Sequence, residues 1–208
     1  MIRVITLDRE YGSGGPEIAR KLAERLGWKL WDQLLTDEIA RQMDCDKRLV
    51  EEREERNDPL RYRLFKAFMR GSLEGSQNAP RLKMVDAECI REFTQKVVTL
   101  AAKSGNSVIV GRGSAYYLHG QPDVFHVFIY APVEEKVRRL RQGGRTEAEA
   151  LELAETVDRD RAEYIKRSFD LEWPARYLFH LMINSAVGED RAVQTILDAL
   201  ALQNAAVG

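Results

Sequence analysis

The sequence predicts a single α/β domain in three layers, with helices on both faces of a mainly parallel five-stranded sheet. Two observations lead to this fold class. Short apolar runs alternate with longer amphipathic segments along the chain, and a glycine-rich turn joins the first apolar run to the first amphipathic segment. Because the 208 residues show no internal repeat and no low-complexity linker, we expect one domain over 1–208.

Five apolar runs are predicted as strands: 2–7, 28–31, 107–111, 124–130 and 178–184. Helical patterns lie between them. Pro16 and Pro132 each fit the first turn of a helix, where no amide donor is needed. Four predicted helices have both ends defined: 16–26, 83–103, 146–169 and 189–203. Two more have one end defined, because one helix ends near residue 44 and another begins at residue 132. Strands that alternate with helices in this way favour parallel pairing.

The segment 45–80 does not fit this alternation. Its first part is charge-dense, with EEREER at 51–56, and its second part mixes aromatic and aliphatic residues with glycine and serine. We interpret 45–80 as a mobile, partly helical insertion within the domain.

The composition indicates a soluble globular protein. Hydrophobic residues make up 44% and charged residues 31%, and 32 basic residues almost balance 33 acidic ones. This balance gives no global basic field that would point to nucleic acid or to a membrane surface. We see no signal-peptide pattern, no apolar stretch near the ~20 residues of a membrane span, and no close cysteine pair. We therefore expect a cytoplasmic protein.

The strongest local signal is ITLDREYGSGGPEIA at 5–19. A glycine-rich turn between a strand and a helix aims several backbone amides at one point, and the helix N-terminus adds partial positive charge there. Such a cradle suits the phosphates of a nucleotide. A turn that only joins the strand to the helix is the alternative, because a lone GxGG has little specificity.

This segment resembles the phosphate loop of the cytidylate-kinase-like family, in the P-loop nucleoside monophosphate kinase class. Asp8 matches the aspartate before that loop, and the family's variant loop reads REYGSGG, as residues 9–15 do here. The resemblance implies a P-loop NTPase-type fold, with ATP and Mg²⁺ as cofactors and small-molecule nucleotides as partners. It places the cofactor site at Gly12, Ser13, Gly14, Gly15 and Glu17.

Two positions depart from an ordinary Walker A loop. Gly15 stands where that loop has its phosphate-binding lysine, and Pro16 stands where it has a magnesium-binding serine or threonine. The lysine is a point charge on the transferring phosphates. Its loss either abolishes catalysis or passes the task to arginines, of which Arg9 is the nearest. We assign no metal ligand.

The segment VIVGRGSAYYL at 108–118 resembles the GRD segment that ends the third strand of cytidylate kinases. Arg112 matches the arginine that meets the acceptor's phosphate, and its planar fork suits that task. A surface ion pair is the alternative, and Gly113 replaces the family's aspartate. Asp32 resembles an aspartate of the family's acceptor-binding segment, although a helix N-cap explains it nearly as well.

The basic run at 137–145 resembles the lid entry of the class, and the segment DRDRAEYIKRSFD at 158–170 resembles the DRDR segment that follows the lid in cytidylate kinases. We therefore expect a lid region over 138–170. Lid arginines close over the triphosphate and neutralise charge, whereas charge runs are otherwise solvated helix faces. Spacing of two places Arg159 and Arg161 on different helix faces. The lid candidates are Arg138, Arg141 and Arg145, and the candidates for phosphate contact after the lid are Arg159, Arg161 and Arg167.

The resemblance implies a phosphotransferase that passes the γ-phosphoryl group of ATP to a nucleoside monophosphate such as CMP or dCMP. Catalytic roles then fall to Arg9, Arg141, Arg145 and Arg161, and substrate contacts to Asp32, Arg112, Arg159 and Arg167. Two alternatives stay open. One is a catalytically silent nucleotide-binding or sensor protein, suggested by Gly15 and Pro16, and the other is a kinase of another small molecule.

Overall fold

The computed structural model describes residues 1–32 and 87–206. This part of the chain contains a five-stranded sheet with the order β2-β3-β1-β4-β5, and every pair of neighbours is parallel. The strands are β1 (Val4–Arg9), β2 (Lys29–Trp31), β3 (Ser107–Val110), β4 (Val124–Tyr130) and β5 (Leu181–Asn184). The predicted α/β fold class is confirmed.

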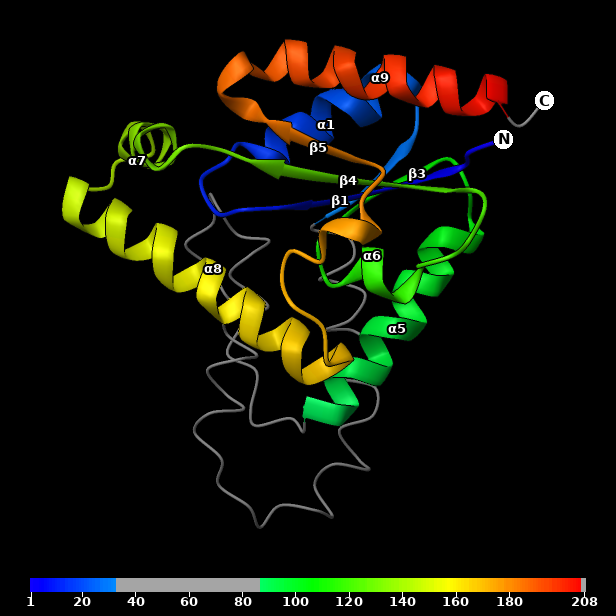
Figure 1. Ribbon diagram of the computed structural model, residues 1–208, viewed down its shortest axis with the longest axis horizontal. Coiled ribbons are helices and arrows are strands. Elements are labelled where there is room, and N and C mark those ends of the chain that lie inside the picture. The colour runs from blue at the N-terminus through cyan, green and yellow to red at the C-terminus, as the bar shows by residue number, and fades with distance from the viewer. Residues whose placement is uncertain (33–86, 207–208) are drawn as a thin grey trace.

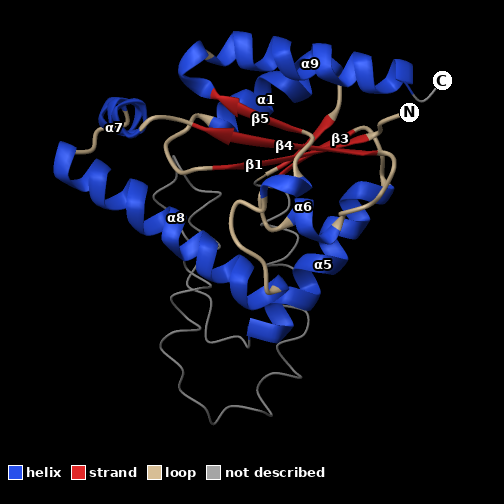
Figure 2. Cartoon of the chain, viewed as in Figure 1, coloured by secondary structure: helices blue, strands red, loops and turns tan. Residues whose placement is uncertain are grey.

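Helices cover both faces of the sheet (Figure 1). On one face lie α1 (Gly15–Leu26) and α9 (Glu189–Ala206), and on the other lie α5 (Ala87–Lys103), the short α6 (Ser114–Tyr117) and α8 (Glu147–Phe169). The strands form the middle layer between them (Figure 2). Among the helices described, none is both long and apolar enough to cross a membrane.

Each helical layer buries its own apolar core against the sheet. Ile18 and Leu22 of α1 and Ile196 of α9 are fully buried with strand residues such as Leu7 and Val127. On the opposite face, α5 packs Val97 and Val98 against Val4 and Ile109. This burial holds the central strands rigidly, so residues at their ends are well positioned.

Two predicted strand boundaries are wrong. The first strand was expected at 2–7, but β1 continues to Arg9 because Asp8 and Arg9 pair with Phe128 and Ile129 of β4. The last strand was expected at 178–184, but a 3₁₀ turn, η2 (Arg176–Leu178), comes first and β5 begins only at Leu181. The other predicted strands and helices agree with the structure to within a few residues, as far as they are described, whereas the short α6 was not predicted.

The predicted insertion at 45–80 and the helix expected to end near residue 44 lie outside the described residues. Beyond β4, α7 (Val133–Gln142) follows Pro132 and leads to α8, which begins with a capping box between Thr146 and Glu149. A second 3₁₀ turn, η3 (Ser185–Val187), joins β5 to α9.

Candidate active site

The glycine-rich loop lies between the end of β1 and the start of α1. Gly12 and Gly14 have φ angles of 75° and 78°, which glycine adopts without the steric cost that other residues meet. Gly14 is the N-cap of α1, and Pro16 occupies its first turn. The loop thus stands at the carboxyl end of the central strand and at the positive end of the helix dipole, where anions bind favourably.

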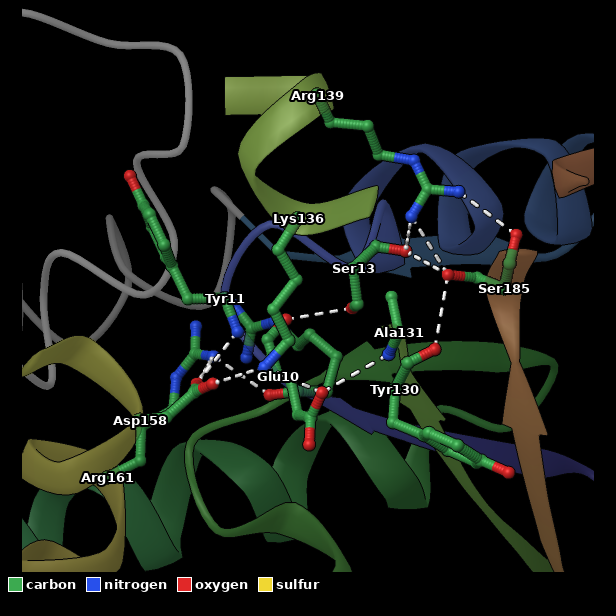
Figure 3. A network of polar contacts seen from close by, with 11 residues as sticks. Glu10, Tyr11, Ser13, Tyr130, Ala131, Lys136, Arg139, Asp158, Arg161 and Ser185 are labelled. Atoms are coloured by element: carbon green, nitrogen blue, oxygen red, sulfur yellow. Dashed lines mark hydrogen bonds and ion pairs between the residues drawn. The ribbon is translucent and has the colours of Figure 1, made fainter. Parts of the chain in front are cut away.

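Helix α7 packs directly on this loop. A Cβ atom on Gly12 would lie 3.2 Å from Cβ of Lys136 and 3.2 Å from Cδ1 of Leu140. The Arg139 guanidinium donates to the Ser13 carbonyl oxygen (2.9 Å) and to the Ser185 carbonyl oxygen (3.0 Å). Figure 3 shows Arg139 reaching over Ser13 toward Ser185. Helix α7 therefore holds the loop where it turns into α1.

The side chain of Arg9 lies across two glycines. A Cβ atom on Gly15 would be 2.6 Å from Cγ of Arg9 and 2.8 Å from its Cβ, and one on Gly111 would overlap Nη1 of Arg9. The arginine is only 3% exposed. Position 15, where an ordinary loop has its lysine, is thus a glycine that leaves room for an arginine from β1.

The turn after β3 is left-handed at three successive residues. Gly111, Arg112 and Gly113 have φ angles of 63°, 58° and 67°, and the Ser114 amide closes the turn by donating to the Gly111 carbonyl oxygen (3.0 Å). A non-glycine residue in this conformation costs about 1–3 kcal/mol and persists where its surroundings hold it. Such strain often marks functional sites.

Arg112 is buried among other charged groups. Burial, followed by the positive charge of Arg9, lowers its pKa from the ordinary value, and the carboxylate of Asp32 acts in the opposite direction. The charge of Arg161 lowers it further. A guanidinium nevertheless keeps its proton in proteins. Three guanidinium groups therefore meet at the carboxyl ends of β1 and β3, an arrangement whose mutual repulsion a bound anion would relieve.

Arg161 reaches this place from α8. Its Nη1 donates to the Arg9 carbonyl oxygen (2.8 Å) and to Oδ1 of Asp158 (3.1 Å), and its side chain is largely buried. Asp158 also accepts hydrogen bonds from the Tyr11 amide (2.7 Å) and from Lys136 Nζ (3.1 Å). Figure 3 shows Lys136 between Asp158 and Glu10.

The other predicted arginines do not join this cluster. Arg138 and Arg141 are exposed and pair with Glu135 (2.8 Å) and Glu147 (3.4 Å). Arg145, Arg159 and Arg167 are also exposed. Glu17 lies at the start of α1 and pairs with Arg20. The roles that we expected for Glu17 and for these exposed arginines stay predictions.

Sequence reasoning missed the contribution of α7. Lys136 and Arg139, three residues apart, share one helix face with buried Leu140. That spacing was a usable signal, because a cation on the apolar face of a helix needs a partner when it is buried. Ser185, whose hydroxyl donates to the Ser13 carbonyl oxygen (2.6 Å), gave no comparable signal.

The strand order, the loop at the end of β1 and the converging arginines define a P-loop kinase-type α/β protein. The chain belongs to the cytidylate kinase-like family, whose model matches residues 4–187. This confirms the resemblance seen in the sequence, and the match spans the loop, the turn at Arg112 and all of α8. Family membership suggests nucleotide-dependent phosphotransfer.

Solved structures agree on the fold. The chain is 23% identical to an uncharacterised protein from Eubacterium ventriosum, over 95% of this chain and 97% of that one, with a TM-score of 0.66. Shikimate kinase from Acinetobacter baumannii, in complex with shikimate, is 19% identical over 98% and 95% of the two chains, with a TM-score of 0.53. Shikimate kinase from Bacteroides thetaiotaomicron is 15% identical over 97% and 99%, with a TM-score of 0.50. No curated protein matches the sequence of this chain.

Proposed function

We propose that the protein transfers the γ-phosphoryl group of ATP, with Mg²⁺, to a nucleoside monophosphate such as CMP or dCMP. The observation that supports this best is the path of Arg9. Its side chain begins beside Gly15, where the lysine is missing, and its guanidinium lies against Gly111, next to Arg112. This positive charge lies between the phosphate loop and the arginine turn, on the route that a phosphoryl group would take.

The residues fit the phosphates of ATP. Gly12, Ser13, Gly14 and Gly15 form a turn at a helix N-terminus, with Glu17 at its edge, and buried guanidinium groups lie beside it. Mg²⁺, which retains water and binds phosphate oxygens, would enter with ATP and neutralise charge on the phosphates. Pro16 offers no hydroxyl ligand for it.

In the proposed reaction, the protein supplies position and charge. The loop holds the donor phosphates, Arg112 grips the acceptor's phosphate, and Arg9 and Arg161 neutralise charge that develops during transfer. A phosphate acceptor is already anionic, so it needs no general base. The guanidinium groups are largely shielded from water, so their attraction for the charge on the transferring phosphoryl group is stronger than it would be in bulk water.

The proposal extends to parts of the chain away from this cluster. We propose that Arg141 and Arg145 approach the phosphates when the lid region over 138–170 closes, and that Arg159, Arg167 and Asp32 contact substrate. It also treats 1–208 as one cytoplasmic domain, in which 45–80 is an insertion on the acceptor side.

A coupled assay over all nucleoside monophosphates, with ATP and Mg²⁺, tests the proposal. We expect turnover, with CMP or dCMP as the best acceptor. A kinase of another small molecule would turn over only with some other acceptor, so the screen includes non-nucleotide alcohols. Turnover with none of these acceptors would contradict the proposed reaction.

A silent nucleotide-binding protein is the second candidate, and the loop itself favours it because Gly15 and Pro16 lack the lysine and the hydroxyl. Titration calorimetry separates the two functions. Binding of ATP without turnover would support the second candidate. The absence of any heat at millimolar ATP, with folded protein and Mg²⁺, would contradict both.

A further inference from the structure

Asp158 lies on the inward side of α8, and its carboxylate receives three donors. Oδ1 accepts from the Tyr11 amide (2.7 Å) and from Arg161 Nη1 (3.1 Å), while Oδ2 accepts from Lys136 Nζ (3.1 Å). Its side chain is 15% exposed. Figure 3 shows these groups around Asp158. One carboxylate thus links the phosphate loop, α7 and α8.

The charges around Asp158 are balanced. Lys136, whose side chain is 9% exposed, also pairs with Oε2 of Glu10 (2.7 Å), which accepts from the Ala131 amide as well (3.2 Å). Buried charges are tolerated when they are paired and hydrogen-bonded. Burial raises the pKa of Asp158, and the charges of Arg161 and Lys136 act against that rise. The two cations therefore favour the ionised carboxylate.

Arg161 is the arginine of α8 that pairs with Asp158. The two residues are one helical turn apart, and the same Nη1 atom that meets Asp158 donates to the Arg9 carbonyl oxygen (2.8 Å). Arg159 and Arg167 of the same helix are exposed. Of these three arginines, Arg161 is thus the one that pairs with Asp158 and reaches the end of β1.

We propose that Asp158 is a positioning residue, which fixes Arg161 against the phosphate loop before a nucleotide binds. This inference rests on the proposed function, because it treats Arg161 as a phosphate contact. A pre-organised guanidinium loses less conformational freedom when it grips a phosphate. Charge alone predicts the opposite effect, since a carboxylate near a phosphate site repels the anion. The sign of the effect on binding therefore separates the two roles.

A double-mutant cycle measured by titration calorimetry with ATP and Mg²⁺ tests the assignment. Asp158→Asn should weaken binding by about tenfold or more, as loss of a charge-assisted contact commonly does. In the Arg161→Gln background the same substitution should change affinity by less than about twofold, because its effect passes through Arg161. Glu163→Gln removes a negative charge from an exposed position of α8 and should not weaken binding.

Two results would overturn the assignment. Equal weakening in both backgrounds would show that Asp158 only supports the fold, and tighter binding by Asp158→Asn would show that its charge only repels ATP. If Asp158→Asn does not fold, Asp158→Glu takes its place, because it keeps the charge and moves the carboxylate by one methylene. Failure of the folded wild type to bind ATP would contradict the proposed function itself, and the role of Asp158 with it.

Discussion

Gly15→Ala provides a direct test of the path of Arg9. Alanine suits the backbone at this position, the first residue of α1, and replacing glycine at a compatible position stabilises a protein by about 0.4–1 kcal/mol. The added Cβ, however, would lie 2.6 Å from Cγ of Arg9, well inside the optimal separation of about 3.5–4.0 Å between carbon atoms. Overpacking of this kind typically costs about 1–3 kcal/mol. We expect Gly15→Ala to destabilise the protein by about 0.5–2 kcal/mol.

The effect of Gly15→Ala on the free energy of unfolding should change sign when Arg9 is removed. Arg9→Gly removes both atoms that the added Cβ would meet, Cβ and Cγ of Arg9. Arg9→Ala would keep the Cβ of residue 9, which lies 2.8 Å from the added atom, so glycine is the better choice. In the Arg9→Gly background, Gly15→Ala should therefore stabilise by up to about 1 kcal/mol. The difference between the two backgrounds is a coupling free energy of about 1–3 kcal/mol.

Urea unfolding of the four proteins measures this coupling. Gly143→Ala is a matched control, because Gly143 has a φ of −80° and should respond equally in both backgrounds. If Gly15→Ala has the same effect with and without Arg9, the arginine does not lie across position 15. Gly15→Lys carries the same Cβ and should also displace Arg9, so a lysine cannot simply be restored to this loop.

Three further predictions concern separate parts of the molecule. Arg112→Gly, which suits the φ of 58°, should raise the acceptor's KM by about tenfold or more and leave ATP affinity nearly unchanged in steady-state and calorimetric assays; an unchanged KM would exclude a phosphate contact. Burial, followed by the charge of His180, lowers the pKa of His126 to about 4 from 6.5. The contribution of neutral His126 to the free energy of unfolding should therefore be fully present above pH 6.5 and fall by about 3 kcal/mol toward pH 4, at about 1.4 kcal/mol per pH unit. In urea titrations, His126→Asn should lessen this loss of stability, and an equal loss in the variant would refute the prediction. Thr146→Ala removes the hydroxyl that caps the Glu149 amide (3.3 Å) and should cost about 1 kcal/mol, or about 2–4 °C in Tm; no change by calorimetry would mean that the cap is not formed in solution.

The parts of the fold that were predictable depend on local patterns. Apolar runs and helical periodicity gave the element types, and the glycines at 12 and 14 marked a loop because few other residues tolerate a left-handed backbone. Arg112 was found because its segment resembles the family's GRD segment and follows a predicted strand. Polar Asp8 and Arg9 did not look like strand residues, and only their pairing with β4 makes them part of β1.

The arrangement of the candidate site depended on contacts between distant segments. Nothing in the loop alone shows that Gly15 and Gly111 leave room for one arginine, because the two glycines are far apart in the chain. Lys136 and Asp158 belong to charge-rich helices, which are solvent-exposed in most proteins. Their burial follows from how α7 and α8 pack on the loop, which a single sequence does not reveal.

The grip of α7 on the phosphate loop has a mechanical consequence. Lys136 pairs with Glu10 before the loop turns, and Arg139 holds Ser13 where α1 begins, so α7 cannot swing away as a rigid body without pulling the loop apart. The run 141–149 is exposed throughout and contains Gly144, whose φ is 87°. We expect any lid motion to be confined to this exposed run, which carries Arg145, while the part of α7 on the loop and the donor cradle stay still.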